Sequence, residues 1–158
     1  MRATSIRSAA RALSFLSFLA IPFLAAPAWA QAPIQSQDTN ISGLVAEITE
    51  CKRADGVLSV RMRLKNTTDK KIDVHLIRQR NYDDYYLTAG SKKYFVLRDS
   101  EKTPLAPRAD GSGYFSTGIE KGGTFVWWAK FPAPPADVKK VSYFTPLAPP
   151  FDNIPITD

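Results

Sequence analysis

Apolar and polar residues alternate with a period of two along much of the chain, which is the pattern of a strand with one buried face. The clearest example is residues 58–65, where four apolar residues alternate with four polar ones. The apolar set is Leu58, Val60, Met62 and Leu64. The alternation restarts over residues 72–76, after a segment from Asn66 to Lys70 that is rich in turn formers. These segments predict two strands joined as a hairpin or as a corner between two sheets.

The densest aromatic cluster lies between Gly122 and Pro135. It begins with a glycine pair and ends in prolines, which cannot continue a sheet ladder. One face of the expected strand is wholly apolar and the other is mixed. The apolar face consists of Phe125, Trp127, Ala129 and Phe131. We therefore expect Trp127 to point into the core and Trp128 to point outward.

Further strands are expected over residues 44–48, 81–87, 93–98, 115–119, 138–145 and 151–156. The apolar residues of 138–145 fall on both faces, so the register of the last two strands stays open. Residues 103–112 contain two prolines and Asp-Gly, and they predict a surface loop. About seven to eight short strands without a helical period predict an all-β fold, an immunoglobulin-like antiparallel β-sandwich. A closed barrel is the main alternative.

The first thirty residues have the organisation of a signal peptide. A positively charged start without acidic residues precedes an apolar run, and Ala28-Trp29-Ala30 supplies a small-x-small site. We therefore predict a signal peptide over residues 1–30, with cleavage between Ala30 and Gln31. An uncleaved membrane anchor is the alternative, because the apolar run is nearly long enough to span a bilayer. Prolines in and after the run favour cleavage.

Cleavage changes both the domain organisation and the charge. Polar residues 31–40 predict a flexible leader, and residues 41–158 predict a single domain. The chain has 21 Lys and Arg against 15 Asp and Glu, and removing three signal arginines leaves 18 against 15, or +3. The remaining cations are scattered or occur in short lysine pairs. We therefore expect no binding to nucleic acid, and membrane contact only through the signal segment.

Cys51 is the one cysteine of the chain. An exported protein with one thiol has no internal disulfide, so its fold rests on hydrophobic packing. We expect Cys51 to be buried at the end of a strand, because free cysteine is among the most buried residue types. Pairing between two molecules is the alternative.

Several segments resemble bacterial secreted or periplasmic immunoglobulin-like domain proteins of uncharacterised function. They are residues 58–74, residues 93–99, the Gly-Gly turn before Phe125, residues 131–135 and residues 150–156. The resemblance implies an adhesion or scaffolding module outside the cytoplasm. Some members are lipoproteins, but Cys51 lies too far beyond the signal to carry a lipid. The resemblance supplies no catalytic residues.

No arrangement of residues predicts catalysis. His75, the one histidine, falls on the polar face between Val74 and Leu76, and it has no neighbouring histidine or cysteine at metal-ligand spacing. Asp110-Gly111-Ser112-Gly113-Tyr114 has only the Gly-Ser-Gly core of a nucleophile elbow. We therefore predict that the protein is not an enzyme and needs neither cofactor nor metal.

The aromatic residues give the better functional signal. Trp128, Tyr82, Tyr85 and Tyr86 are predicted to form an exposed platform. Exposed Tyr and Trp suit packing into a protein partner or stacking on sugars. The leading hypothesis is a periplasmic or secreted, non-catalytic interaction or scaffolding module of the bacterial cell envelope, whose partner is another envelope protein. The alternative is a carbohydrate-binding module that uses the exposed Tyr and Trp side chains.

Overall fold

The computed structural model describes residues 32–158, which form an all-β structure. The predicted signal peptide and its cleavage position between Ala30 and Gln31 lie outside the described residues. Within residues 32–158, no helix has the length and apolar character that a membrane crossing requires.

Ten strands are present in this part of the chain. They are β1 (Gln35–Asp38), β2 (Leu44–Ala54), β3 (Val57–Asn66), β4 (Ile72–Ile77), β5 (Tyr86–Ala89), β6 (Lys92–Phe95), β7 (Phe115–Ile119), β8 (Thr124–Pro132), β9 (Lys140–Thr145) and β10 (Ala148–Pro155). All pairings between these strands are antiparallel. The predicted all-β, antiparallel class is therefore confirmed.

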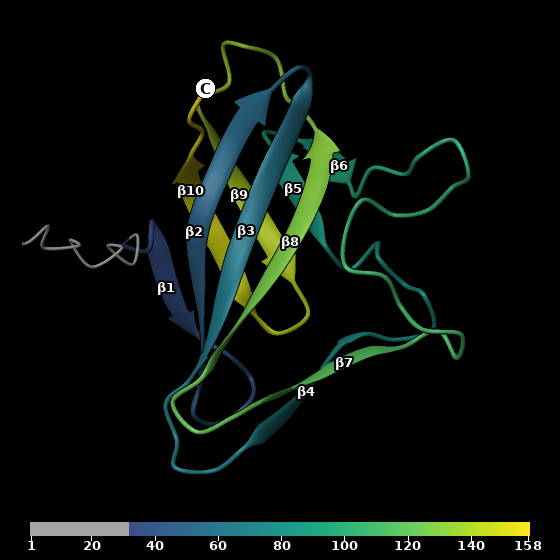
Figure 1. Ribbon diagram of the computed structural model, residues 1–158. Helices are drawn as coiled ribbons and strands as arrows, with labels where there is room; N and C mark the ends of the chain where they lie inside the picture. Colours follow the sequence, from purple (N-terminus) through teal and green to yellow (C-terminus); the bar gives the residue numbers. More distant parts are fainter. Residues whose placement is uncertain (1–31) are drawn as a thin grey trace, which may run out of the picture. The chain divides into compact units, whose positions relative to one another are not determined.

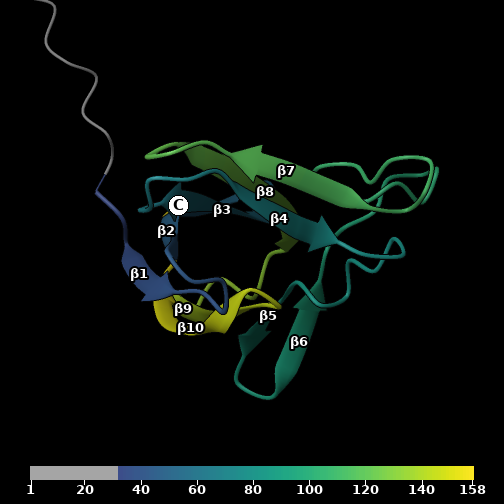
Figure 2. The same ribbon diagram turned by 90° about the horizontal axis from the view of Figure 1, so that it is seen from below.

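The strands form two four-stranded sheets and one two-stranded ribbon (Figure 1). The front sheet has the order β1-β2-β3-β8, and the back sheet has the order β10-β9-β5-β6. The β4–β7 ribbon is separate, and Figure 2 shows it on the same side of the core as β3 and β8. The long connection from β6 to β7 first contacts the end of β8 and then extends away from the sheets as loops.

One hydrophobic core lies between the sheets. The front sheet contributes the apolar face of β3 together with Trp127, Ala129 and Phe131, and the back sheet contributes Leu87 and Tyr143. Rings from the two sheets meet directly, because the Phe131 and Tyr143 centroids lie 6.1 Å apart. The predicted division of the aromatic strand is confirmed, since Trp127 is buried and Trp128 is exposed.

The structure fixes the register of the last two strands. In β9, Val141, Tyr143 and Thr145 point into the core, whereas Phe144 is only half-buried on the outer side. Strand β10 pairs with β9 through two register shifts, which place Phe151 opposite Tyr143 and Ile154 opposite Val141. These irregularities explain why simple alternation did not reveal the register.

The predicted flexible leader is corrected over part of its length. Residues Gln35–Asp38 form β1, which pairs with β2 at the edge of the front sheet. The Gln37 amide donates to the Pro150 carbonyl, and the Asn40 N–H donates to the Leu147 carbonyl. Hydrogen bonds, rather than apolar packing, therefore hold this polar segment against both sheets.

A buried asparagine joins the β3–β4 turn to the end of β7. Asn66 is fully buried, and its amide donates to the carbonyls of Lys70 (2.6 Å), Ile119 (2.9 Å) and Glu120 (3.2 Å). Its side-chain oxygen accepts from the backbone N–H and the hydroxyl of Thr68. A residue predicted only as a turn former is thus the polar link between two strands.

Candidate functional site

The predicted aromatic platform does not form. Trp128 is 39% exposed on the outer face of the front sheet, but Tyr86 is half-buried on the outer face of the back sheet. Tyr82 and Tyr85 are only 2% and 0% exposed, so the prediction that they are surface residues is wrong. The four side chains therefore do not share one surface.

Tyr82 and Tyr85 are buried because their hydroxyl groups find partners inside the protein. Tyr85 donates to the Leu76 carbonyl at 2.6 Å, and its ring centroid lies 4.6 Å from that of Trp127. Burial raises the pKa of the Tyr85 hydroxyl above its ordinary value. The Tyr82 hydroxyl donates to the Pro107 carbonyl and accepts from the Ala109 N–H, which ties a long loop to the core.

Tyr86 belongs to a row of aromatic rings across the back sheet. Phe144, Tyr86 and Phe95 lie opposite one another on three neighbouring strands. The rings of Tyr86 and Phe144 are stacked at 4.5 Å, and the Lys93 ammonium lies 4.3 Å from the Tyr86 centroid. The Tyr86 ring therefore already has an aromatic and a cationic neighbour, which leaves it poorly suited to stacking on a sugar.

Trp128 lies on β8, the last strand of the front sheet. Arg61 is its register partner on β3, and Val126 lies two residues away on the same face with 46% exposure. The Arg61 guanidinium lies 3.5 Å from the Glu50 carboxylate, so its charge is already paired within the front sheet. Trp128 and Val126 thus form a small exposed apolar pair next to ion-paired side chains.

In this part of β8, the backbone N–H and C=O groups of alternate residues point away from β3. At one end of the strand, Lys130 donates to the Leu105 carbonyl and accepts from the Leu97 N–H, so its polar groups point outward. At the other end, the Gly123 carbonyl accepts from the Asn66 N–H and points toward β3. The register between them is unbroken. Period two therefore directs the backbone groups of Val126 and Trp128 outward, where no described residue bonds to them.

His75 is exposed, as the sequence predicted, and its Nδ1 lies 2.6 Å from the Ser116 Oγ. The two residues face each other in the β4–β7 register. Asp73 and Asp84 line the same surface cavity of about 340 Å³ as His75. Across residues 32–158, no group of three or more His, Cys, Asp or Glu side chains is arranged to hold a metal ion.

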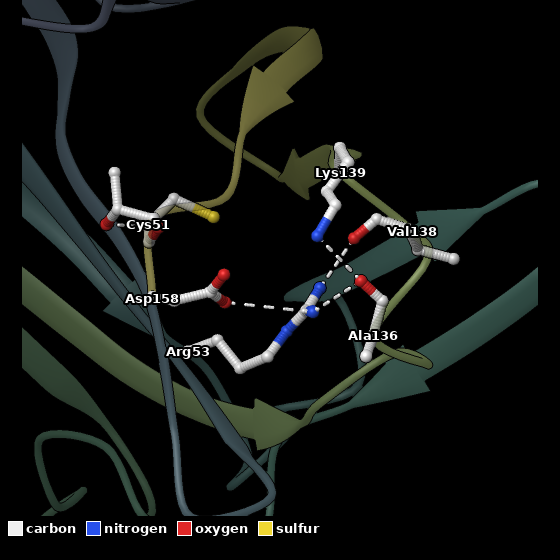
Figure 3. Close-up of polar contacts among 7 residues, drawn as sticks. Cys51, Arg53, Ala136, Val138, Lys139 and Asp158 are labelled. Carbon is white, nitrogen blue, oxygen red and sulfur yellow. Dashed lines mark hydrogen bonds and ion pairs between the residues drawn. The ribbon is translucent and has the colours of Figure 1, made fainter.

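Cys51 is buried, as predicted, next to a cluster of polar contacts that holds the C-terminal residues (Figure 3). The guanidinium of Arg53 donates to the carbonyls of Ala136 at 3.2 Å and Val138 at 2.6 Å, and it lies 3.8 Å from the Asp158 carboxylate. These bonds satisfy two backbone carbonyl groups of the loop between β8 and β9. The Arg53 cluster therefore fastens the loop and the chain end to β2.

A basic pocket was missed by the sequence analysis. It has a volume of about 550 Å³ and lies between the segment after β4 and the β6–β7 connection. Its cationic lining residues are Arg80, Arg98, Lys102 and Arg108. They are not consecutive in the sequence, and Arg80 comes from a different connection than the other three, so a search for runs of charge could not find them.

Comparisons with known proteins supply no function. No family model matches the chain, and no curated protein matches it. A search of solved structures found a partial similarity to a functionally unknown protein from Listeria monocytogenes EGD-e. That protein is 13% identical with a TM-score of 0.34, and the match covers 70% of this chain and 71% of the other.

Proposed function

We propose that the protein is an exported, non-catalytic interaction module of the bacterial cell envelope, with an immunoglobulin-like sandwich fold. It docks another envelope protein, in the periplasm or outside the cell, at the open edge of β8. The signal-type sequence of residues 1–30 supports export. The outward backbone groups of Val126 and Trp128 are the observation that carries the docking proposal.

The strand order supports the immunoglobulin-like assignment. In that fold, strands A-B-E lie in one sheet and G-F-C, often with C′, lie in the other. The chain order of β2-β3-β8 and of β10-β9-β5-β6 corresponds to these two sets. Strand β7 departs from the pattern, because it occupies the chain position of strand D but pairs with β4.

An open sheet edge offers main-chain donors and acceptors to an added strand, and exposed side chains beside it give selectivity. Natural edges are commonly protected by lysine, proline or a covering loop. In β8 the loop protects only the end at Lys130, where Leu97 and Leu105 bond. The neighbouring part carries exposed Val126 and Trp128 instead of protective residues. An extended segment of a partner protein fits this combination.

The carbohydrate alternative has less support. It requires free ring faces, but Phe144 stacks on the Tyr86 ring and the Lys93 ammonium lies 4.3 Å from the ring centroid. Among residues 32–158, Trp128 alone retains an exposed indole. A shift of Trp128 fluorescence on titration with an oligosaccharide, absent in Trp128→Phe, would favour this alternative over a protein partner.

Val126→Pro is the sharpest test of the edge. Proline removes the Val126 N–H, which points away from β3, so the existing ladder stays intact while an added strand loses one donor. Val126→Thr is the matched control, because it keeps the N–H and the β-branched shape. We expect a photo-crosslinking residue at position 128 to give one defined adduct in cells.

The adduct should disappear in Val126→Pro and persist in Val126→Thr, with both variants folded by circular dichroism. Retention of the adduct in a folded Val126→Pro variant would show that the β8 edge is not the docking surface. A crosslinker at Thr88, on the back sheet, controls for proximity. Equal adducts from positions 88 and 128 would also count against the proposal.

A further inference from the structure

The basic pocket carries more positive charge than its surroundings neutralise. Four cations line it, and Asp110 is its one carboxylate. Among residues 32–158, Lys102 and Arg108 make no ion pair, and Arg98 reaches only Asp83, at 3.9 Å. An unneutralised cluster of this kind attracts anions, and the concave shape concentrates its field.

Among residues 32–158, the Asp110 carboxylate makes no ion pair, and its own turn engages one of its oxygens. One of its oxygens accepts from the N–H groups of Ser112 and Tyr114 and from the Ser112 hydroxyl. These hydrogen bonds hold the pKa of the Asp110 carboxyl below its ordinary value. Asp110 therefore stays ionised and shapes the rim of the pocket, and its one negative charge leaves the four cations in excess.

Arg80 is held in place from two directions. Its N–H donates to the Gly113 carbonyl at 2.8 Å, and its guanidinium donates to the Gly111 carbonyl at 2.9 Å. Gly113 has a φ of +88°, and an added Cβ would lie 3.4 Å from the Arg80 Cγ. Glycine is thus required where the two walls of the pocket meet.

Lys102 and Arg98 are positioned by a tight turn. The Asp99 carboxylate accepts from the N–H groups of Glu101 and Thr103, and Lys102 itself has a φ of +63°. Arg98 donates to the Lys102 carbonyl at 3.3 Å. The turn therefore presents two cations side by side on one wall.

The floor of the pocket positions Arg108. The Tyr82 hydroxyl bonds to Pro107 on one side of Arg108 and to Ala109 on the other. Because Tyr82 is itself buried, the backbone on both sides of Arg108 is anchored to the core. The Arg108 side chain is exposed and makes no hydrogen bond to any described residue. It is free to contact a ligand.

We propose that this pocket binds a ligand through a phosphate group. Three guanidinium groups and one ammonium converge on it, and guanidinium forks match phosphate oxygens in a bidentate geometry. A phosphate monoester carries about −1.5 to −2 charges at neutral pH, which suits this excess better than one carboxylate does. The volume is that of a small-molecule site. The phosphate belongs either to a soluble metabolite or to a lipid headgroup.

Calorimetric titration with inorganic pyrophosphate tests the proposal on the mature protein. The pocket variant is Lys102→Ala with Arg108→Ala, because neither side chain has a structural bond. The matched control is Lys70→Ala with Lys121→Ala, which removes two exposed lysines elsewhere. We expect saturable binding that weakens at least about tenfold in the pocket variant and less than about twofold in the control.

Malonate and vesicles complete the design. Malonate, a dicarboxylate, should bind at least about tenfold more weakly than pyrophosphate. Binding of pyrophosphate and of vesicles that contain phosphatidic acid, a lipid with a phosphate monoester headgroup, is compared to identify the source of the phosphate. Vesicle binding that requires Lys102 and Arg108, without pyrophosphate binding, assigns a lipid headgroup. The proposal is overturned if neither probe binds, if malonate equals pyrophosphate, or if the pocket and control variants weaken binding equally.

Discussion

Asn66 offers the most direct test of how the β-structure is held together. Its amide donates to three carbonyls at once, and its oxygen accepts from Thr68. Asn66→Ala removes all of these bonds while keeping the backbone of β3 free to pair. We expect the variant to fold with a lower free energy of unfolding.

The magnitude follows from which groups lose their partner. Lys70 and Glu120 are exposed residues, so water can replace Asn66 at their carbonyls. The Ile119 carbonyl bond is buried and the Thr68 N–H bond is partly buried, so these two groups lose a partner at full or partial cost. At about 1–3 kcal/mol for each unsatisfied buried group, the total is about 3 kcal/mol. This is a large part of the ~5–15 kcal/mol stability of a typical domain.

Urea denaturation followed by tryptophan fluorescence measures this loss. A loss of that size should also lower the Tm by roughly 10 °C for a domain of about 130 residues. Asp69→Asn is the control, because Asp69 is exposed in the same turn and makes no side-chain bond to a described residue. A loss below about 1 kcal/mol in Asn66→Ala, or an equal loss in Asp69→Asn, would refute the structural role of Asn66.

Asn66→Asp is a second test, because it replaces only the side-chain NH₂ group, with its two donors, by an acceptor oxygen. Burial beside three carbonyl oxygens raises the pKa of an introduced carboxyl above its unfolded value. The protonated form therefore persists in the native state, and the variant should lose stability as the pH rises from about 4 to 7. A pH-independent difference between Asn66→Asp and the parent would contradict this environment.

Two further predictions concern buried ionisable groups. The Tyr143 hydroxyl is buried without a hydrogen-bond partner among the described residues, whereas the Tyr85 hydroxyl bonds to Leu76. Tyr143→Phe should therefore be neutral or stabilising, and Tyr85→Phe should cost about 1–2 kcal/mol in urea denaturation; equal effects would contradict this difference. Burial raises the pKa of the Cys51 thiol from 9.0 to about 12, so between these values the unfolded chain releases a proton that the native state keeps. Stability should fall across that range, and Cys51→Ala should flatten the fall in denaturation curves from pH 8 to 11; an unchanged slope would refute the assignment.

Period-two patterns predicted the strands well wherever each strand has one buried face. The residues of β7 coincide with the predicted range, and alternation correctly separated Trp127 from Trp128. Strand β1 was missed because Gln35–Asp38 contains no apolar residue. The strand is instead held by antiparallel pairing with β2. Hydrophobic periodicity cannot detect a strand that is fixed by backbone pairing alone.

Tyr82 and Tyr85 show the opposite failure. Both precede β5, so the alternation of a strand does not apply to them. The chain reaches them through Gln79 and Arg80, which both have positive φ, and this reversal directs the rings inward. A single sequence gives no sign of two successive left-handed residues that are not glycine. The exposure of Tyr82 and Tyr85 could therefore be predicted only from their residue type, and that prediction was wrong.

The basic pocket lies beyond sequence prediction for a related reason. Arg80 and Arg108 come from different connections, and the Arg80 bond to Gly113 brings these connections together. The scattered cations of the sequence thus become one cluster through loop geometry rather than through charge runs. The same β6–β7 connection supplies Leu97 and Leu105, whose bonds to Lys130 end the open edge of β8. Residues 103–112, which their prolines and Asp-Gly predicted only as a surface loop, therefore form one wall of the pocket, and Leu105 within them helps to limit the docking edge.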